Sequence, residues 1–90
     1  MNKDMLTLYQ SLFRDASGYR VSISKLAMIR KKMESNDLCN AIPLLIREIE
    51  IHVRRNIKGE EERKRELTSL SIRRNQFLEL KEDEARRKGK

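Results

Sequence analysis

The sequence predicts an all-α protein, a small bundle of three or four helices. Apolar residues recur at spacings of three and four along most of the chain. With 90 residues, 38% hydrophobic and 39% charged, there is room for one domain whose core rests on Leu, Ile and Met. The one candidate strand, at Tyr19–Val21, has no other strand to pair with. We therefore expect a single helical domain over residues 1–85, with a frayed basic tail at 86–90.

The first predicted helix covers residues 3–16. Its apolar residues fall on one face of about three turns and are Met5, Leu8, Tyr9, Leu12 and Phe13. The segment SGYRVS follows, in which Gly18 ends the helical pattern and either Ser22 or Ser24 can cap the next helix. A short extended piece at Tyr19–Val21 is a further possibility for this linker.

The second predicted helix is ISKLAMIRKKMES, with Leu26, Ile29 and Met33 on one face. The residues SND interrupt the pattern. Two residues in this region can cap the third helix, Asp37 and Asn40. We favour Asn40, because Pro43 then falls in the first turn, where its missing N–H is not needed. With Asp37 as the cap, Pro43 kinks the helix one turn later.

The third helix, residues 40–58, is the clearest element, a rod of about 28 Å. Six of its apolar residues, together with Leu38 from its lead-in, fall within an arc of about 120°. We expect this stripe to form the core or an interface, together with two residues further on. The predicted core or interface residues are Leu38, Ile42, Leu45, Ile46, Ile49, Val53, Ile57, Leu67 and Leu70.

A break in the helix is expected at Gly59, followed by three glutamates that favour a new helix start. The fourth element, residues 62–87, carries Leu67, Leu70 and Phe77 on one side, with Leu78 as a further candidate for that side. Arg74 interrupts this seam. The apolar seam covers under two heptads, which is short for a coiled coil. This C-terminal helix therefore either closes the bundle, projects from it, or pairs with a second copy.

A small, highly charged chain buries little surface by itself, and we expect a homodimer that supplies the missing burial. Cys39 is the single cysteine, so no disulfide forms within the chain. The N-terminus lacks the clean apolar run of a signal peptide, and IPLLI is too short to span a bilayer. We therefore expect a cytoplasmic protein with no membrane partner.

Enzyme chemistry is not expected. His52 and Cys39 are the only histidine and cysteine, and thirteen residues on one helix separate them by about 19 Å, beyond hydrogen-bond reach. No carboxylates stand at metal-ligand spacing beside them, and no glycine loop could cradle a phosphate. We predict no catalytic residue, no metal site and no cofactor.

The net charge of +7 favours an anionic partner, and nucleic acid is the first candidate. A basic ridge can follow phosphates without reading bases. The residues that we expect to contact phosphates are Arg54, Arg55, Lys58, Arg63, Arg65, Arg73 and Arg74. The opposing interpretation is a solvated helical face on which nearby glutamates neutralise these cations. A helix-turn-helix is disfavoured, because the turn lacks glycine and the third helix is overlong.

Two functions follow from these features. The first is a non-enzymatic nucleic-acid-binding regulator or accessory factor that acts as a dimer through phosphate contacts. The second is a protein–protein adaptor, or an inhibitor or immunity-type helical bundle, that docks on an acidic partner protein. The sequence alone leaves both open.

Overall fold

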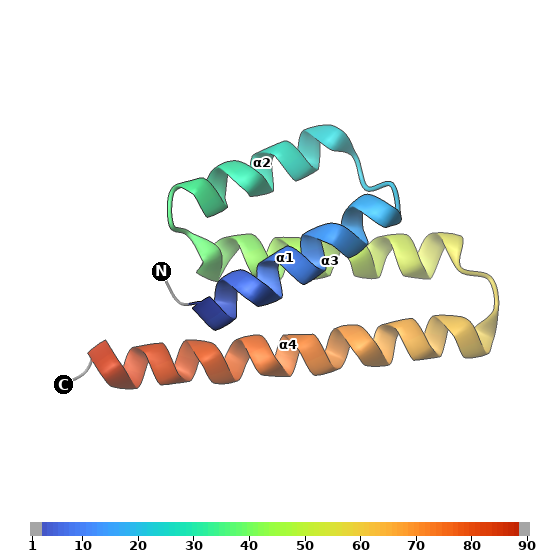
Figure 1. Cartoon of the computed structure of the whole chain (residues 1–90). Coiled ribbons are helices and arrows are strands. Elements are labelled where there is room, and N and C mark those ends of the chain that lie inside the picture. Colours follow the sequence, from blue (N-terminus) through green and yellow to red (C-terminus); the bar gives the residue numbers. More distant parts are fainter. Residues whose placement is uncertain (1–2, 89–90) are drawn as a thin grey trace.

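Four helices make up the part of the chain that the computed structural model describes, residues 3–88 (Figure 1). They are α1 (Lys3–Gly18), α2 (Ile23–Glu34), α3 (Leu38–Asn56) and α4 (Glu60–Lys88). No strand occurs among residues 3–88, and the helices pack against one another. The predicted all-α bundle is therefore confirmed.

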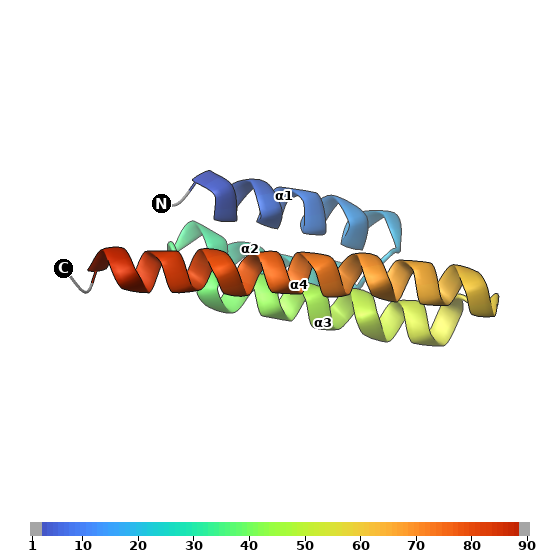
Figure 2. The same cartoon turned by 90° about the horizontal axis from the view of Figure 1, so that it is seen from below.

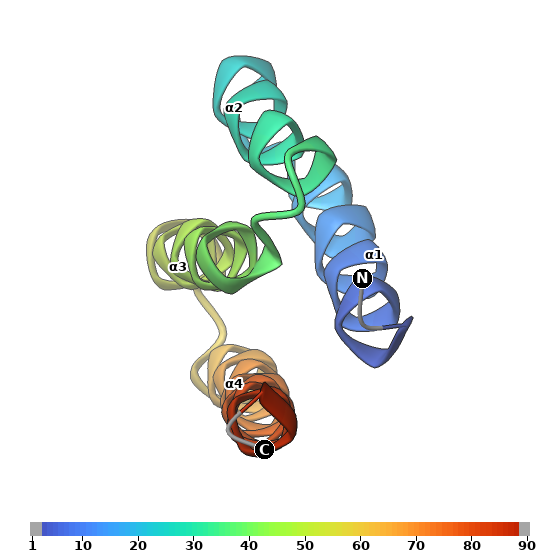
Figure 3. The same ribbon diagram turned by 90° about the vertical axis from the view of Figure 1, so that its left-hand side faces the viewer.

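The central helix is α3, and α1, α2 and α4 all contact it. Seen end on, α3 lies between α2 and α4, and α1 covers one side of it (Figure 3). Six stripe residues are at most 4% exposed: Leu38, Ile42, Leu45, Ile46, Ile49 and Val53. Ile57, at the end of α3, is partly buried. The apolar stripe is thus covered within one chain, largely by α1, whose buried face includes Leu8 and Leu12.

The link between α1 and α2 is a helix C-cap, so the extended piece considered for Tyr19–Val21 is wrong. The Val21 N–H donates to the Ala16 carbonyl (3.1 Å) and the Arg20 N–H donates to the Ser17 carbonyl (3.1 Å). This pair of bonds, with Arg20 at φ 62°, is the Schellman motif, in which an apolar residue after the turn packs back on the helix. Val21 and Ala16 are both buried accordingly. Gly18 is the last helical residue, and the left-handed position falls on an arginine.

We expect Arg20→Gly to stabilise the chain by about 0.5–1 kcal/mol. A residue with a Cβ costs about 1–2 kcal/mol in the left-handed conformation, and glycine removes this cost. Glycine also has more conformational freedom in the unfolded chain, which offsets part of the stabilisation. Urea unfolding followed by circular dichroism measures the difference as a higher midpoint at unchanged slope. Asn36→Gly is the matched control, since Asn36 has the same φ of 62° but asparagine tolerates it, so its effect should be smaller. A lower midpoint for Arg20→Gly would contradict this account of the turn.

The helix α3 begins earlier than we favoured from the sequence. A second Schellman motif, with Asn36 at its left-handed position, ends α2 and reverses the chain at once, so that Asp37 becomes the N-cap. The choice of Asn40 as the cap was therefore wrong. The Asn40 amide instead donates to the Asp37 carboxylate oxygens, at 2.9 and 3.1 Å. Pro43 lies inside α3, which is helical on both sides of it.

The predicted break at Gly59 is confirmed, since α3 ends at Asn56 and α4 begins at Glu60. The Gly59 carbonyl accepts the Arg63 N–H (2.9 Å), which starts α4. Beyond this turn α4 runs back along α3, and its last turns extend past the start of α3 (Figures 1 and 2). The helix α4 is about 43 Å long and α3 about 28 Å, so the end of α4 extends beyond α3 because α4 is longer.

Few residues hold α4 to the bundle. Leu70 and Phe77 are its buried residues, at 3% and 4% exposure, and Leu67 and Leu80 are partly buried. The helix continues to Lys88, so Arg86 and Arg87, which we assigned to a frayed tail, are helical; residues 89–90 lie outside the described range. The C-terminal helix therefore both closes the bundle, through its first two thirds, and projects from it.

Candidate functional site

Three of the seven predicted phosphate-contacting residues are already bound to carboxylates of the same chain. Arg54 and Arg74 both pair with Glu50, at 3.2 and 2.8 Å. Arg73 pairs with Asp15 on α1 at 2.6 Å, and its side chain is only 17% exposed. For these three arginines the neutralised-face interpretation describes the structure better than an open phosphate-binding ridge.

The other four predicted residues lie near the turn between α3 and α4. These residues are Arg55, Lys58, Arg63 and Arg65. None of them forms an ion pair with any of residues 3–88. Arg63 is partly buried, and the other three are exposed. Three glutamates, Glu60, Glu61 and Glu62, occupy the first turn of α4 in their midst. The predicted basic set is thus divided into a paired group and an unpaired group.

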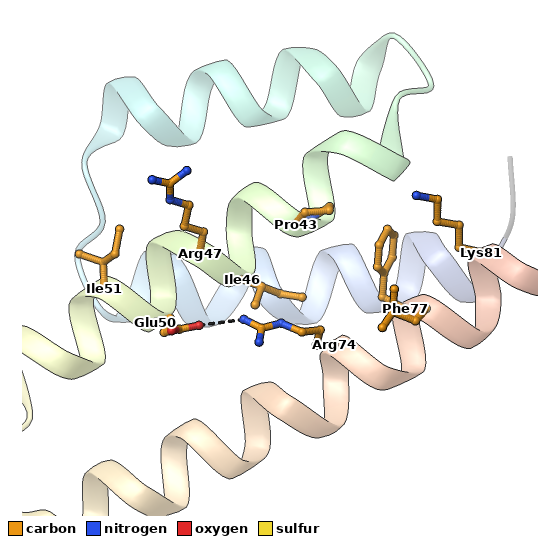
Figure 4. Close-up of a pocket in the computed structure, with 9 residues that line it drawn as sticks. Pro43, Ile46, Arg47, Glu50, Ile51, Arg74, Phe77 and Lys81 are labelled. Carbon is orange, nitrogen blue, oxygen red and sulfur yellow. Dashed lines mark hydrogen bonds and ion pairs between the residues drawn. The ribbon is translucent and has the colours of Figure 1, made fainter.

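A groove with a volume of about 650 Å³ lies between α3 and α4 (Figure 4). Its lining comes from both helices and consists of Pro43, Ile46, Arg47, Glu50, Ile51, Arg74, Phe77, Leu78 and Lys81. The Phe77 ring and Ile46 form the deep part, at 4% and 2% exposure, whereas Leu78 is 50% exposed. The floor of the groove is therefore apolar, and the side chain of Leu78 is half exposed to solvent.

Cations surround this apolar floor. Arg47 projects from α3, and Lys81 and Arg74 project from α4, on the other side of the groove (Figure 4). Against these three, the groove holds one carboxylate, Glu50, which already pairs with Arg74. The rim therefore carries an excess of positive charge over an apolar surface.

The arginine neighbours of Glu50 hold the pKa of its carboxyl below its usual range. The hydrogen bond from Arg74 lowers the pKa of Glu50 most, and burial opposes it. The charge of Arg74 and the hydrogen bond and charge of Arg54 lower the pKa further. Arg74 is thereby held across the groove, with its guanidinium directed at α3 (Figure 4).

A neighbouring hollow lies toward the α3–α4 turn. This second, smaller hollow of about 170 Å³ shares Glu50 and Arg74 with the first and adds Leu67, Leu70 and Ser71 to the lining. From Leu67 to Lys81 the two hollows extend about 21 Å along α4. The shape is therefore elongated, following the helix axes.

His52 and Tyr19 form a packed cluster. Their rings lie 5.2 Å apart, and the Tyr19 hydroxyl donates a short hydrogen bond to the Glu66 carboxylate on α4. The Asn56 amide lies 3.2 Å from His52 Nδ1. Burial, followed by the bond to Glu66, raises the pKa of Tyr19 to about 12. This cluster ties the end of α1 to both α3 and α4.

We expect the stability of the chain to fall between about pH 10 and pH 12. The pKa of Tyr19 rises from 10.0 in the unfolded chain to about 12 in the folded one, so the folded state keeps a proton that the unfolded state loses. The stabilisation is complete below pH 10 and is lost as the pH approaches 12. Urea midpoints measured across this range should fall less steeply for Tyr19→Phe, which has no hydroxyl. Equal slopes for the two proteins would contradict the assignment.

The sequence reasoning did not identify the groove. Arg47, Ile51 and Lys81 were not singled out, and Pro43 was considered only for its backbone. One signal for the groove was present in the sequence. Leu78 lies about 100° around α4 from Phe77, so the two side chains cannot both point directly into the core.

Comparison with known proteins gives no relative from which a function could be transferred: no family model matches the chain, and no similar curated protein or solved structure was found. No helix within residues 3–88 combines the length and the apolar character needed to cross a membrane. Among the same residues, no three His, Cys, Asp or Glu side chains gather as they would to hold a metal ion.

Proposed function

We propose that this chain is a non-enzymatic docking protein that binds an acidic partner protein through the α3–α4 groove. The observation that carries the proposal is the composition of the groove, in which Arg47, Arg74 and Lys81 border an apolar lining. Leu78 is the half-exposed apolar residue of that lining. Apolar surface provides the affinity of most protein interfaces, and complementary charge provides orientation and association rate. A partner with apolar side chains and flanking carboxylates satisfies both features.

The proposal is tested by photo-cross-linking from inside the groove. A benzophenone amino acid is placed in the full chain at Leu78, and in a second variant at Ile72, which is 63% exposed on the same helix but lines no part of the groove. We expect a specific cross-linked protein from position 78 alone. That protein, identified by mass spectrometry and purified, should carry an acidic contact region and bind the chain less tightly at high salt. Equal cross-linking from both positions would overturn the proposal.

Nucleic acid is the second candidate, as the partner of a regulator or accessory factor. It is favoured by the net charge of +7 and by the four cations near the α3–α4 turn that have no ion pair within the described residues. The scarcity of exposed aromatic rings weighs against stacking on single strands, since Tyr9 and Phe77 are buried. The glutamates of the same turn reduce the local positive potential.

A salt titration separates the two candidates. Retention of duplex DNA or RNA should decrease as salt is added. On DNA, the logarithm of the binding constant should fall against the logarithm of the salt concentration with a slope of about 0.9 for each phosphate contact. If the turn binds phosphates, Arg55→Ala together with Lys58→Ala should reduce that slope, whereas Arg73→Ala, at a residue engaged with Asp15, should not. No retention at low salt would exclude nucleic acid as the partner.

The homodimer expected from the sequence stays a prediction for solution measurement. We expected a dimer because one small, charged chain was thought to bury too little apolar surface by itself. In the structure, however, α1, α2 and α4 together cover the α3 stripe. Analytical ultracentrifugation at high micromolar concentration decides it, since a strict monomer would contradict the prediction.

A further inference from the structure

We infer that the occupant of the α3–α4 groove is one amphipathic helix of the partner, with carboxylates on both flanks of its apolar face. This inference rests on the proposed docking function and names the kind of segment that docks. It depends on how α3 and α4 are already packed, on the length of the groove, and on the distribution of its charges.

Two antiparallel helices form a groove on each of their two sides, and in this chain a helix already fills one of them. On that side α1 contacts both α3 and α4. On the opposite side of the pair no segment of residues 3–88 lies against the groove (Figure 3). In the close-up, α1 passes behind α3 while the groove residues face the viewer (Figure 4). The open side has the shape that a second helix, placed like α1, would fill.

The dimensions of the groove also favour a helix. The two hollows, which share Glu50 and Arg74, together extend about 21 Å along α4, which equals about four turns. The accessible apolar surface comes from Ile51 and Leu78, over a deeper floor of Ile46 and Phe77. An amphipathic helix presents anchors at i, i+3, i+4 and i+7, which is the pattern that a groove between two helices accommodates.

The charges indicate the flanks of that helix. Arg47 stands on the α3 side and Lys81 on the α4 side, so carboxylates on both edges of the apolar face would each meet a cation. Arg74 is bound by Glu50, the carboxylate within the groove itself. A partner carboxylate therefore competes with Glu50 for Arg74, and Glu50 weakens binding until it is displaced.

A second copy of this chain complements the groove less well. A two-fold pairing of α4 about Leu78 places on its seam the residues at spacings of three, four and seven, which are Ser71, Arg74, Asn75, Lys81, Glu82 and Ala85. Only Leu78 and Ala85 of this seam are apolar, whereas stable interfaces have an apolar centre. Two copies would also bring two identical cationic rims together. An acidic helix avoids both costs.

The test uses the full chain and three labelled peptides of about 18 residues, which is about 27 Å as a helix. The first has leucines at i, i+3, i+4 and i+7 and glutamates on both flanks. The second replaces each glutamate by lysine. The third keeps the leucines and glutamates of the first but has prolines at two other, central positions, which break the helix. Fluorescence anisotropy should show binding of the first peptide, at least about tenfold weaker binding of the third, and none of the second.

Variants of the chain locate the binding. We expect Leu78→Glu to weaken binding of the acidic peptide by more than about tenfold, and Ile72→Glu, a matched change of an exposed apolar residue on α4, to leave it within about twofold. Glu50→Gln should strengthen binding by about threefold, because Arg74 loses its intrachain competitor. Circular dichroism of each variant confirms that it remains folded.

The outcomes separate this inference from the proposed function. Equal binding of the helical and the proline peptides, both sensitive to Leu78→Glu, would overturn the helical occupant and leave the docking function in place. A dimer that Leu78→Glu dissociates, without peptide binding, would make a second copy the occupant. Failure of all three peptides, together with retention of duplex DNA through Arg47 and Lys81, would overturn both.

Discussion

Leu45→Ala is expected to destabilise the chain by about 3 kcal/mol. Leu45 is fully buried in the middle of the α3 stripe, where α3 meets the rest of the bundle. Truncation of a buried leucine removes its transfer free energy and leaves a cavity, at a total cost of about 2–5 kcal/mol. A domain of 90 residues has a total stability of about 5–13 kcal/mol, so the loss is a large fraction of it. Urea unfolding should show a markedly lower midpoint.

The matched control for this prediction is Ile23→Ala. Ile23 is also a large aliphatic residue in a helix, but it is 85% exposed at the start of α2, and its truncation should change the stability by no more than about 0.5 kcal/mol. If both substitutions cost the same, the α3 stripe is not the core of the folded chain, and the account of the bundle fails.

The stripe was predictable because it depends on one helix alone. Residues such as Ile42 and Ile49 share a face by the 3.6-residue period, whatever packs over them, and a face that apolar is buried in almost any arrangement. The helix start was not predicted, because two acceptable caps stood three residues apart. The left-handed conformation of Asn36, which brings Asp37 into the cap position, has no equally strong signal in the sequence.

The ion pairs and the groove were beyond such reasoning because they join distant segments. Spacing rules compare residues three or four apart, whereas Arg74 reaches a carboxylate 24 residues away and Arg73 reaches Asp15 on another helix. Arg74 was recognised as an interruption of the α4 seam. Its partner across the groove, Glu50, became apparent only once α4 was seen to fold back along α3.

Phe77→Ala is expected to cost about 3–5 kcal/mol and to act mainly on α4. Among residues 60–87 of α4, whose burial the structure describes, only Leu70 and Phe77 are buried, so removal of the ring leaves Leu70 as the one buried anchor among them. An isolated helix with so little apolar surface is marginal in water. We therefore expect the second half of α4 to detach before α3 unfolds. Hydrogen exchange measures this as lost amide protection after Arg74, with protection retained in α3.

The neighbouring substitution Leu78→Ala separates stability from docking. Leu78 is half exposed, so its truncation should leave exchange protection in α4 nearly unchanged while reducing the apolar surface of the groove. Loss of protection in α3 and α4 to the same extent in Phe77→Ala would show that the four helices unfold as one unit. The expected difference has a structural cause, since the Phe77 ring is both the anchor of α4 and the floor of the groove. A ligand that covers this floor should therefore also slow the detachment of α4, because binding to the closed form alone stabilises it.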